Sequence, residues 1–490
     1  MAIATERVRW NGKLYIDGSF VDAEGGSTAP VIEKATGRKL GTLALGGRAD
    51  LDRAVKAARE AQPGWAARSY LERQVVMRAV ARALEERADE YTDMIVRETG
   101  SIRGKAQYEV QAAQNELYEA AGLASRATAE VIPSANPGKM NLIQRMPVGV
   151  VGVITPWNFP LVLGMRAVAP ALALGNTVVL KPASHTPISG GLLLADLFES
   201  AGAPASILQV VTGSGDAIGI PMAEHVDIDM IHFTGSTEVG RRIAEACGRS
   251  LTKVSLELGG NAAFVVLDDA DIDMASMVGA WSTFHYQGQT CISANRHIVM
   301  RSVAERYQEA LAERARRMTV GDPSTDQVSI GPLISEAQRD RAHRIVQSSV
   351  EQGARVVEGA TYDGLFYRPT VLSGVTPGMP AFTEELFAPV APITIVDSEQ
   401  EALEMTNLTE YGLANAVYTG DLARGLAFAE KVRSGMVHVN DAVCLDEAQV
   451  PFGGIGASGL GGRSGGEANL EEFTERRWIS LQRTPVQYPY

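Results

Sequence analysis

The chain has 490 residues, more than one hydrophobic core usually supports, so we expect two or three domains. Its formal net charge of -13 argues against nucleic acid or an anionic membrane as partners, and no apolar run reaches the ~20 residues of a membrane span. The cysteines Cys247, Cys291 and Cys444 lack Cys-x-x-Cys spacing, which indicates a reducing compartment and no metal site. The charged stretch from Met1 to Trp10 has no apolar segment, so we expect no signal peptide and a cytoplasmic protein.

The N-terminal third of the chain predicts short strands followed by helices. Residues 13–16 run into Asp17-Gly18, which is typical of a β-hairpin turn. Asp50 is expected to cap the helix that follows it. Longer helices are predicted over residues 70–98 and 105–129 from the spacing of their apolar residues.

From residue 148 the pattern changes to apolar β-branched runs that alternate with helical segments. Strands are predicted at 149–155, 177–180, 207–211 and 228–233, and helices at 165–174, 187–201 and 236–247. This alternation indicates a parallel sheet covered by helices, which binds nucleotides at the carboxyl ends of its strands. After residue 260 a similar series predicts a second α/β domain, with Cys291 near its start.

Two segments fit neither series. Residues 130–145 alternate in polarity around Asn136-Pro137-Gly138, which predicts a protruding hairpin, and residues 473–482 show a strand-like alternation. An exposed edge strand promotes aggregation unless another strand pairs with it. Pairing with a strand of another subunit is one way to cover such an edge.

Three motifs offer groups for covalent chemistry on a carbonyl. Cys291 follows Gly288, which lets the backbone approach a substrate closely, and its thiolate would be a nucleophile. Glu257 precedes Leu-Gly-Gly and could act as a general base on water or on the thiol. Asn158, within Pro-Trp-Asn-Phe-Pro, carries an amide that could hold an oxyanion. Each residue alone has an ordinary structural explanation, since a lone cysteine is most often a small buried hydrophobe, so the argument rests on the combination.

Other segments suit a nucleotide. Phe-Thr-Gly-Ser at 233–236 follows a predicted strand, and Ser236 can cap the next helix, whose free N–H groups suit a pyrophosphate. An ordinary capped helix explains this motif equally well. Lys181 stands at the carboxyl end of a strand, where a ribose or phosphate contact is expected unless the side chain is merely solvated. The glycines from Gly213 to Gly219 have one residue too many for Gly-x-Gly-x-x-Gly.

In this order the motifs resemble those of the NAD(P)-dependent aldehyde dehydrogenases over essentially the whole chain. The matching segments are 156–160, 181–182, 233–236, 257–260, 288–291, Glu385-Leu386-Phe387 with Pro389, and 451–454. The resemblance implies an α/β aldehyde dehydrogenase fold. Its expected parts are a parallel-sheet nucleotide-binding domain (1–129 and 146–256), an α/β catalytic domain (257–442, with a returning loop at 443–472) and a small β oligomerisation flap (130–145 and 473–490). A homodimer or homotetramer follows from the flap.

The resemblance also implies residue roles. Cys291 would attack the aldehyde carbon, Asn158 would hold the oxyanion with the Cys291 N–H, and Glu257 would activate the water that hydrolyses the thioester. Hydride would pass to NAD or NADP in between. The expected cofactor-binding residues are Ile154, Thr155, Trp157, Lys181, Ser184, Gly215, Gly235, Ser236, Leu258, Glu385 and Phe387. Family members that prefer NAD often carry Glu where Ser184 stands, so we expect this chain to use both cofactors. Ala388 replaces the glycine of the family's common Phe-Gly-Pro, a conservative change.

The substrate is less clearly indicated. Met165-Arg166 and Val-His-Val-Asn-Asp at 437–441 resemble the benzaldehyde and vanillin dehydrogenase branch. Phe159, Tyr286 and Phe452 could line an aromatic slot, although core packing explains them equally well. Arg166 could instead hold the carboxylate of a semialdehyde, and a broad aliphatic specificity is a further alternative.

Two other classes of function are less consistent with the motifs. A structural protein of the same fold would be expected to have lost Cys291, Glu257 or Asn158, and all three are present. A thioesterase-like hydrolase could use the cysteine and the glutamate, but it would not need the cofactor motifs.

Overall fold

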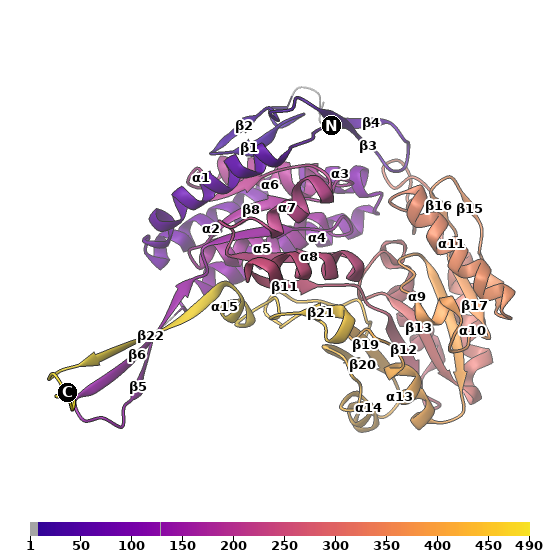
Figure 1. The fold of residues 1–490 in the computed structure, drawn as a ribbon. Helices are drawn as coiled ribbons and strands as arrows, with labels where there is room; N and C mark the ends of the chain where they lie inside the picture. The colour runs from indigo at the N-terminus through magenta and orange to yellow at the C-terminus, as the bar shows by residue number, and fades with distance from the viewer. Residues whose placement is uncertain (1–7, 128) are drawn as a thin grey trace.

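The computed structural model describes residues 8–127 and 129–490. Most of the N-terminal stretch for which we predicted no signal peptide therefore lies outside the described residues. Figure 1 shows two α/β lobes side by side, with a narrow β flap that projects from the first lobe and carries the C-terminus near its tip. Among the described residues, no helix is both long and apolar enough to cross a membrane.

The described part of the first lobe is built on an eight-stranded sheet. The strand order is β2 (Ser19–Val21), β1 (Leu14–Ile16), β9 (Leu208–Val210), β8 (Thr177–Lys181), β7 (Val150–Ile154), β10 (Met230–Thr234), β11 (Lys253–Glu257) and β21 (Gly459–Leu460). The five strands from β9 to β11 are parallel. The chain order reverses between β7 and β10, so the carboxyl ends of these two strands mark the crevice where such sheets bind ligands.

Helices cover both faces of this sheet, as predicted from the βα alternation. Side chains of β7 alternate between two cores: Val151 and Val153 pack on one face, and Val150 and Ile154 on the other. The first core is completed by α2 (Tyr70–Glu86), α3 (Ala88–Thr99), α4 (Arg103–Leu123), α5 (Pro160–Ala173) and α6 (Leu193–Ser200). The second core is completed by α1 (Arg48–Ala66), α7 (Ile220–Ala223) and α8 (Thr237–Ser250).

Several predicted boundaries are wrong. The helix predicted over 70–98 is two helices that meet at Arg87, the helix predicted over 105–129 ends at Leu123, and the helix predicted over 187–201 starts with a π turn at Ile188–Leu192. Asp50 is not an N-cap. Gly47 occupies that position, and Asp50 lies one turn inside the helix, where its carboxylate accepts the Gly47 N–H at 3.0 Å.

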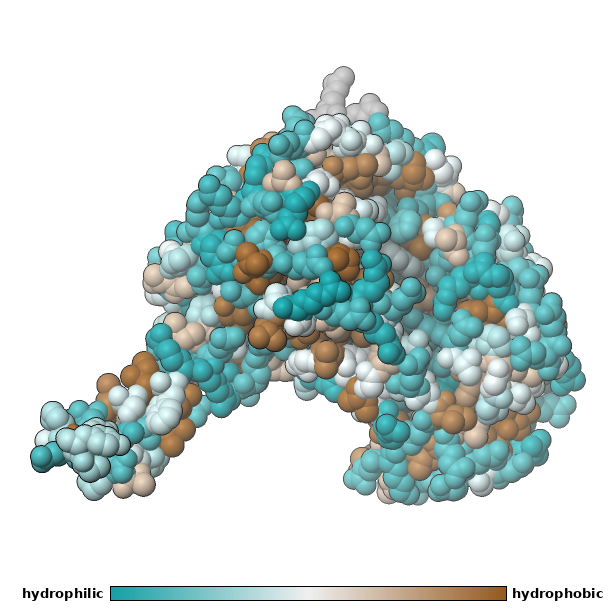
Figure 2. All heavy atoms as spheres, in the orientation of Figure 1, coloured by the Kyte–Doolittle hydropathy of each residue, from teal (hydrophilic) through white to brown (hydrophobic). Residues whose placement is uncertain are grey.

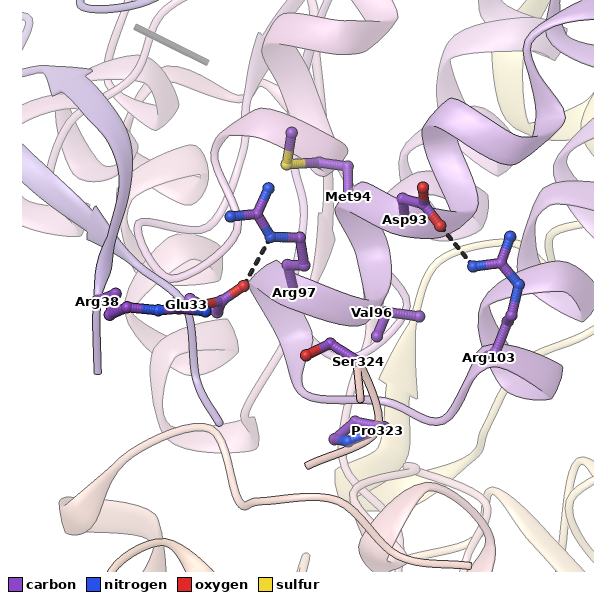
Figure 3. Close-up of a pocket in the computed structure, with 9 residues that line it drawn as sticks. All are labelled: Glu33, Arg38, Asp93, Met94, Val96, Arg97, Arg103, Pro323 and Ser324. Carbon is purple, nitrogen blue, oxygen red and sulfur yellow. Dashed lines mark hydrogen bonds and ion pairs between the residues drawn. The ribbon is translucent and has the colours of Figure 1, made fainter. Parts of the chain in front are cut away.

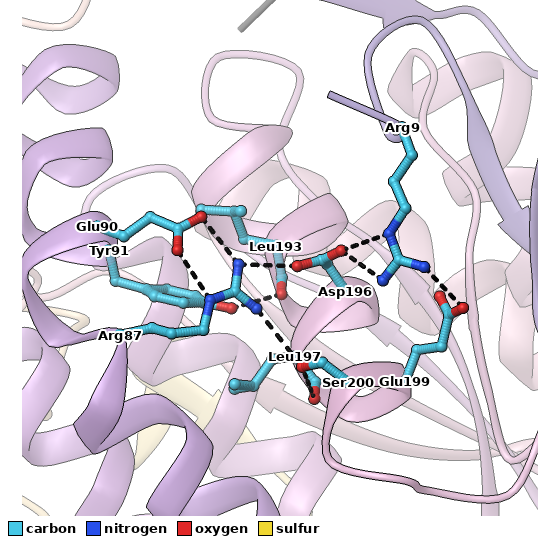
Figure 4. A network of polar contacts seen from close by, with 9 residues as sticks. All are labelled: Arg9, Arg87, Glu90, Tyr91, Leu193, Asp196, Leu197, Glu199 and Ser200. Carbon is cyan, nitrogen blue, oxygen red and sulfur yellow. Dashed lines mark hydrogen bonds and ion pairs between the residues drawn. The ribbon is translucent and has the colours of Figure 1, made fainter. Parts of the chain in front are cut away.

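Arg87, where α2 and α3 meet, belongs to an ionic network that Figure 4 shows. The Arg87 guanidinium donates to Glu90 and lies 2.8 Å from Asp196 on α6. The other oxygen of Asp196 accepts from Arg9, which also pairs with Glu199 at 2.7 Å. One nearly buried carboxylate thus joins the N-terminal segment to two helices.

Seven described strands form the sheet of the second lobe. Their order is β14 (Arg355–Glu358), β17 (Thr370–Ser373), β18 (Val390–Val396), β13 (Ala294–Met300), β12 (Ala262–Val266), β19 (Ala414–Tyr418) and β20 (Met436–Val439). All but β14 are parallel. The principal helices are α9 (Ile272–Phe284), α10 (Arg301–Arg317), α11 (Glu336–Glu351), α13 (Glu399–Asn407) and α14 (Leu422–Ala429). This arrangement agrees with the predicted second α/β unit.

The flap is a three-stranded antiparallel sheet within the described ranges. It consists of β5 (Glu130–Pro133), β6 (Lys139–Pro147) and β22 (Thr474–Gln482), with β6 in the centre. The predicted hairpin and the predicted terminal strand therefore pair with each other. Figure 2 shows apolar side chains on the flap, where Val131 and Trp478 are largely exposed. A role in subunit contact stays a prediction.

Candidate active site

A cavity of about 410 Å³ lies at the carboxyl ends of β10 and β11 and receives side chains from both lobes. Many of the predicted catalytic and cofactor residues line it: Trp157, Asn158, Gly235, Ser236, Glu257, Leu258, Cys291, Glu385 and Phe387. Segments more than 200 residues apart in the chain therefore meet at one place. The sulfur, the carboxylate and the amide that the motifs supply share one cavity.

A sharp turn presents Cys291 to the cavity. Tyr286, Gln287 and Gly288 all have positive φ, at 48°, 57° and 67°. A Cβ on Gly288 would lie 2.2 Å from the Ala388 carbonyl oxygen, so only glycine fits there. Cys291, which is partly exposed, follows these residues and lies just before β13.

Gly259 and Gly260, which follow Glu257, lie too close to other residues for a side chain to fit. A Cβ on Gly260 would lie 2.5 Å from the Cys291 carbonyl oxygen, and one on Gly259 would lie 2.5 Å from the carboxylate of Glu385. The segment passes directly against both residues, which brings Glu257, at the end of β11, into the cavity with Cys291.

Two ionisable groups of the cavity, Glu257 and Cys291, favour their neutral forms at neutral pH. Burial raises the pKa of Glu257 to about 8, and the guanidinium groups of Arg166 and Arg463 only partly oppose it. The pKa of the Cys291 thiol is raised to about 12 by removal from water and by the carboxylates of Glu385 and Glu257. A thiol with this pKa needs a base to remove its proton at neutral pH.

A smaller cavity of about 50 Å³ lies beside Cys291 and Asn158. Three of the four predicted substrate-pocket residues line it: Phe159, Phe452 and Arg166. Apolar residues that the sequence did not single out also line it, namely Ala112, Val162, Leu163 and Ile292, together with the polar side chains of Tyr108, His285, Thr290 and Asp446. The cavity is therefore a narrow and largely apolar slot.

Arg166 is already committed to two carboxylates. Its Nε donates to Glu116 Oε1 at 2.9 Å, and its Nη2 pairs with Asp446. The guanidinium also lies 4.8 Å from the centre of the Phe452 ring. Its side chain is only 6 % exposed, so this charge is balanced within the protein before any substrate enters.

The prediction that Tyr286 lines the slot is wrong. Tyr286 is 1 % exposed and lies behind the slot, with its ring edge-to-face against Phe159 at 5.6 Å. The sequence left two interpretations of Tyr286 open, a slot residue or a core residue, and the structure shows that it is a core residue.

The other predicted cofactor residues lie outside the large cavity, at the neighbouring strand ends. Lys181 pairs in register with Ile154 across β8 and β7, and its Nζ donates to the Pro182 carbonyl at 3.2 Å. Burial lowers the pKa of Lys181 to about 8. Ser184 Oγ donates to the Gly213 carbonyl at 3.0 Å, and Gly215 begins a π turn at Gly215–Gly219. Thr155, just after β7, is buried and its hydroxyl has no hydrogen-bond partner among the described residues.

Sequence reasoning missed Gln338 and Arg341 on α11, which also line the large cavity. Gln338 Nε2 donates to the Phe387 carbonyl at 2.9 Å, and Arg341 Nη1 donates to the Glu385 carbonyl at 2.7 Å. These bonds hold the Glu385–Phe387 segment in place. No spacing in the sequence marks them, because each is a single polar residue on a helix.

Another cavity, of about 330 Å³, lies away from Cys291 and is shown in Figure 3. Its guanidinium groups are already paired: Arg97 with Glu33 at 2.6 Å, Arg38 with Glu33 at 3.1 Å, and Arg103 with Asp93 at 2.5 Å. It contains no cysteine. We therefore place the chemistry at the cavity that holds Cys291.

A cysteine, a carboxylate and an amide around one cavity at the edge of a parallel sheet define an enzyme that acts covalently on a carbonyl group. Comparison with known proteins agrees. The profile of the aldehyde dehydrogenase family matches residues 20–479, and the chain belongs to that family. The family and the fold predicted from the motifs are thereby confirmed.

Individual relatives extend over nearly the whole chain. A benzaldehyde dehydrogenase [NAD(+)] of Pseudomonas putida is 50% identical over 485 residues, which is 99% of both chains. A vanillin dehydrogenase of an Amycolatopsis species is 46% identical over 98% of this chain and 99% of its own. The crystal structure of an aldehyde dehydrogenase from Brucella melitensis biovar abortus superimposes with a TM-score of 0.95 at 35% identity, covering 99% of this chain and 100% of that one.

Proposed function

We propose that this protein oxidises aromatic aldehydes of the benzaldehyde or vanillin type to carboxylic acids, with NAD or NADP as hydride acceptor. The observation that carries the proposal is the narrow apolar slot beside Cys291, between Phe159 and Phe452. A flat ring gains ~25 cal/mol for each Å² of apolar surface that it buries there, whereas a short aliphatic aldehyde offers little area. The names of the two relatives above support the same substrate class.

The residues of the large cavity fit a dinucleotide. The first turn of α8 faces it, and Ser236 caps that helix by accepting the Val239 N–H, which leaves the neighbouring N–H groups for a pyrophosphate. Glu385 would hold a ribose, and Lys181 with Ser184 would hold the ribose at the adenosine end. When bound, the cofactor supplies the hydride acceptor.

Chemistry begins at Cys291. Glu257 takes the thiol proton, and the sulfur forms a bond to the aldehyde carbon while the carbonyl π electrons move to oxygen. The Asn158 amide and the Cys291 N–H hold this oxyanion. When the oxygen lone pair re-forms the carbonyl, hydride leaves the carbon and a thioester on Cys291 remains.

Hydrolysis completes the cycle. Glu257 removes a proton from water, the hydroxide adds to the thioester carbon, and the carbon–sulfur bond breaks to release the carboxylic acid. One residue can serve both steps because its raised pKa of about 8 lets it accept a proton and give it up again near neutral pH.

A semialdehyde is the rival substrate, and the paired state of Arg166 counts against it. A substrate carboxylate would have to displace Glu116 or Asp446 from the guanidinium and leave that carboxylate buried without a partner. The test ranks benzaldehyde, vanillin, acetaldehyde and succinic semialdehyde by kcat/KM, measured from the absorbance of the reduced cofactor. Aromatic aldehydes should lead. If succinic semialdehyde leads and Arg166→Ala erases its advantage, the aromatic assignment is wrong.

We also propose that the flap joins copies of this chain into a homodimer or homotetramer in the cytoplasm. Val131, Ile132, Trp478 and Leu481 expose apolar side chains on it, and such groups gain from burial between subunits. Sedimentation of the intact protein tests this, and a monomer at micromolar concentration would contradict it.

A further inference from the structure

A buried ion pair lies behind the active site, on a helix that the motifs do not include. Lys105 and Glu109 are one turn apart on α4, and the side chains of both are 0 % exposed. Neither residue lines either of the two active-site cavities. Burying two charges is costly unless each polar atom has a hydrogen-bond partner. The partners of Lys105 and Glu109 therefore indicate the role of the pair.

Lys105 holds the backbone of Asn158. Its Nζ donates to Glu109 Oε2 and, at 2.8 Å, to the carbonyl oxygen of Asn158. The side chain of Asn158 lacks a comparable anchor: within the described ranges its Oδ1 has no hydrogen-bond partner. The position of the amide in the cavity therefore depends on how firmly the backbone is held.

Glu109 fixes the start of the next helix. Its Oε1 accepts the N–H of Leu161 at 2.8 Å, at the first turn of α5. Phe159, the N-cap residue of α5, has no side-chain oxygen with which to cap the helix. A carboxylate from a neighbouring helix thus replaces the missing cap immediately after Asn158.

The same ammonium group connects the two catalytic loops. Lys105 Nζ lies 4.1 Å from the centre of the Phe159 ring and 4.2 Å from that of Tyr286. Phe159 adjoins Asn158, and Tyr286 belongs to the sharp turn that presents Cys291. The two rings also contact each other edge-to-face at 5.6 Å, and one cation packed against both strengthens this link between the Asn158 loop and the Cys291 loop.

We propose that Lys105 and Glu109 are a positioning pair for the oxyanion-holding amide. They touch neither substrate nor cofactor, and they act by setting the distance between the Asn158 amide and the carbon bonded to Cys291. This inference rests on the proposed function, because it takes Asn158 to hold the oxyanion. Misplacing such a group by ~1 Å can slow a reaction on the order of 100-fold.

The principal variant is K105M/E109Q. It removes both charges together, so no unpaired charge stays buried, and the amide oxygen introduced by E109Q can still accept the Leu161 N–H. It lacks the ion pair, the donor to the Asn158 carbonyl and the cation that packs against the two rings. Lys56 and Glu60, an exposed pair with the same spacing on α1, supply the matched control K56M/E60Q. Thermal melting of each variant checks that it is folded.

The readout is the rate of the first turnover with benzaldehyde and NAD, followed in a stopped-flow instrument. K105M/E109Q should be slower by ~10- to 100-fold, with the Kd for NAD changed by less than about threefold, and the control should match wild type. In a double-mutant cycle with N158A, the triple variant should be within about twofold of N158A alone, since the pair acts through Asn158.

Two other results separate the inference from the proposed function. If N158A is slow but K105M/E109Q keeps the wild-type rate, or if the two effects multiply, the positioning role is overturned and the proposed function stands. If N158A itself turns over at the wild-type rate, Asn158 does not hold the oxyanion, and the proposed mechanism fails.

Discussion

The raised pKa of Glu257 predicts how activity depends on pH. Burial raises this pKa from the ordinary value of 4.5 to about 8, so near pH 6 only about one molecule in a hundred carries the base in its ionised form. The ionised fraction rises about tenfold per pH unit until it levels off above pH 8. Because Cys291 has an even higher pKa, it cannot supply its own thiolate in this range.

The assay is kcat/KM for benzaldehyde at saturating NAD between about pH 6 and pH 9, in wild type and in Glu257→Gln. Wild type should show a rise with an apparent pKa near 8. Glu257→Gln should be much slower and flat over the same range, and mass spectrometry should detect an acyl adduct on Cys291 if hydrolysis is the slower step. A flat wild-type profile, or the same rise in Glu257→Gln, would refute the assignment of Glu257 as the base.

The remaining predictions concern other residues. Cys291→Ala should abolish turnover and leave NAD binding measurable by fluorescence titration; turnover within about tenfold of wild type would contradict its role. Ser184→Glu should lower kcat/KM for NADP relative to NAD by tenfold or more, because two charges ~4 Å apart repel by ~1 kcal/mol in water and more when desolvated. Arg166→Met leaves the carboxylates of Glu116 and Asp446 without a partner, so denaturant titration should show that the free energy of unfolding falls by ~3–5 kcal/mol. An unchanged midpoint would show that water solvates these two carboxylates. Asp196→Ala removes the carboxylate between Arg9 and Arg87 and should lower the Tm without changing KM.

The sequence by itself identified the residues whose chemistry cannot be replaced. A nucleophile, a base and an amide donor require particular side chains, and the glycines beside Cys291 and Glu257 are required because any Cβ there would clash. These constraints are local, so they leave motifs. The alternation of strands and helices is local as well, and it predicted the parallel sheet of the first lobe and a second α/β domain.

Only the tertiary structure decided how these residues are supported. Arg166 meets Asp446 across 280 positions of sequence, and Lys105 meets the Asn158 carbonyl across 53. The inward turn of Tyr286 and the contacts of Gln338 from α11 depend likewise on distant segments. Such contacts leave no periodicity or motif, because each is a single side chain whose partner is chosen by packing. Local sequence determined which reactive groups this protein has, and their alignment arose only when the chain packed.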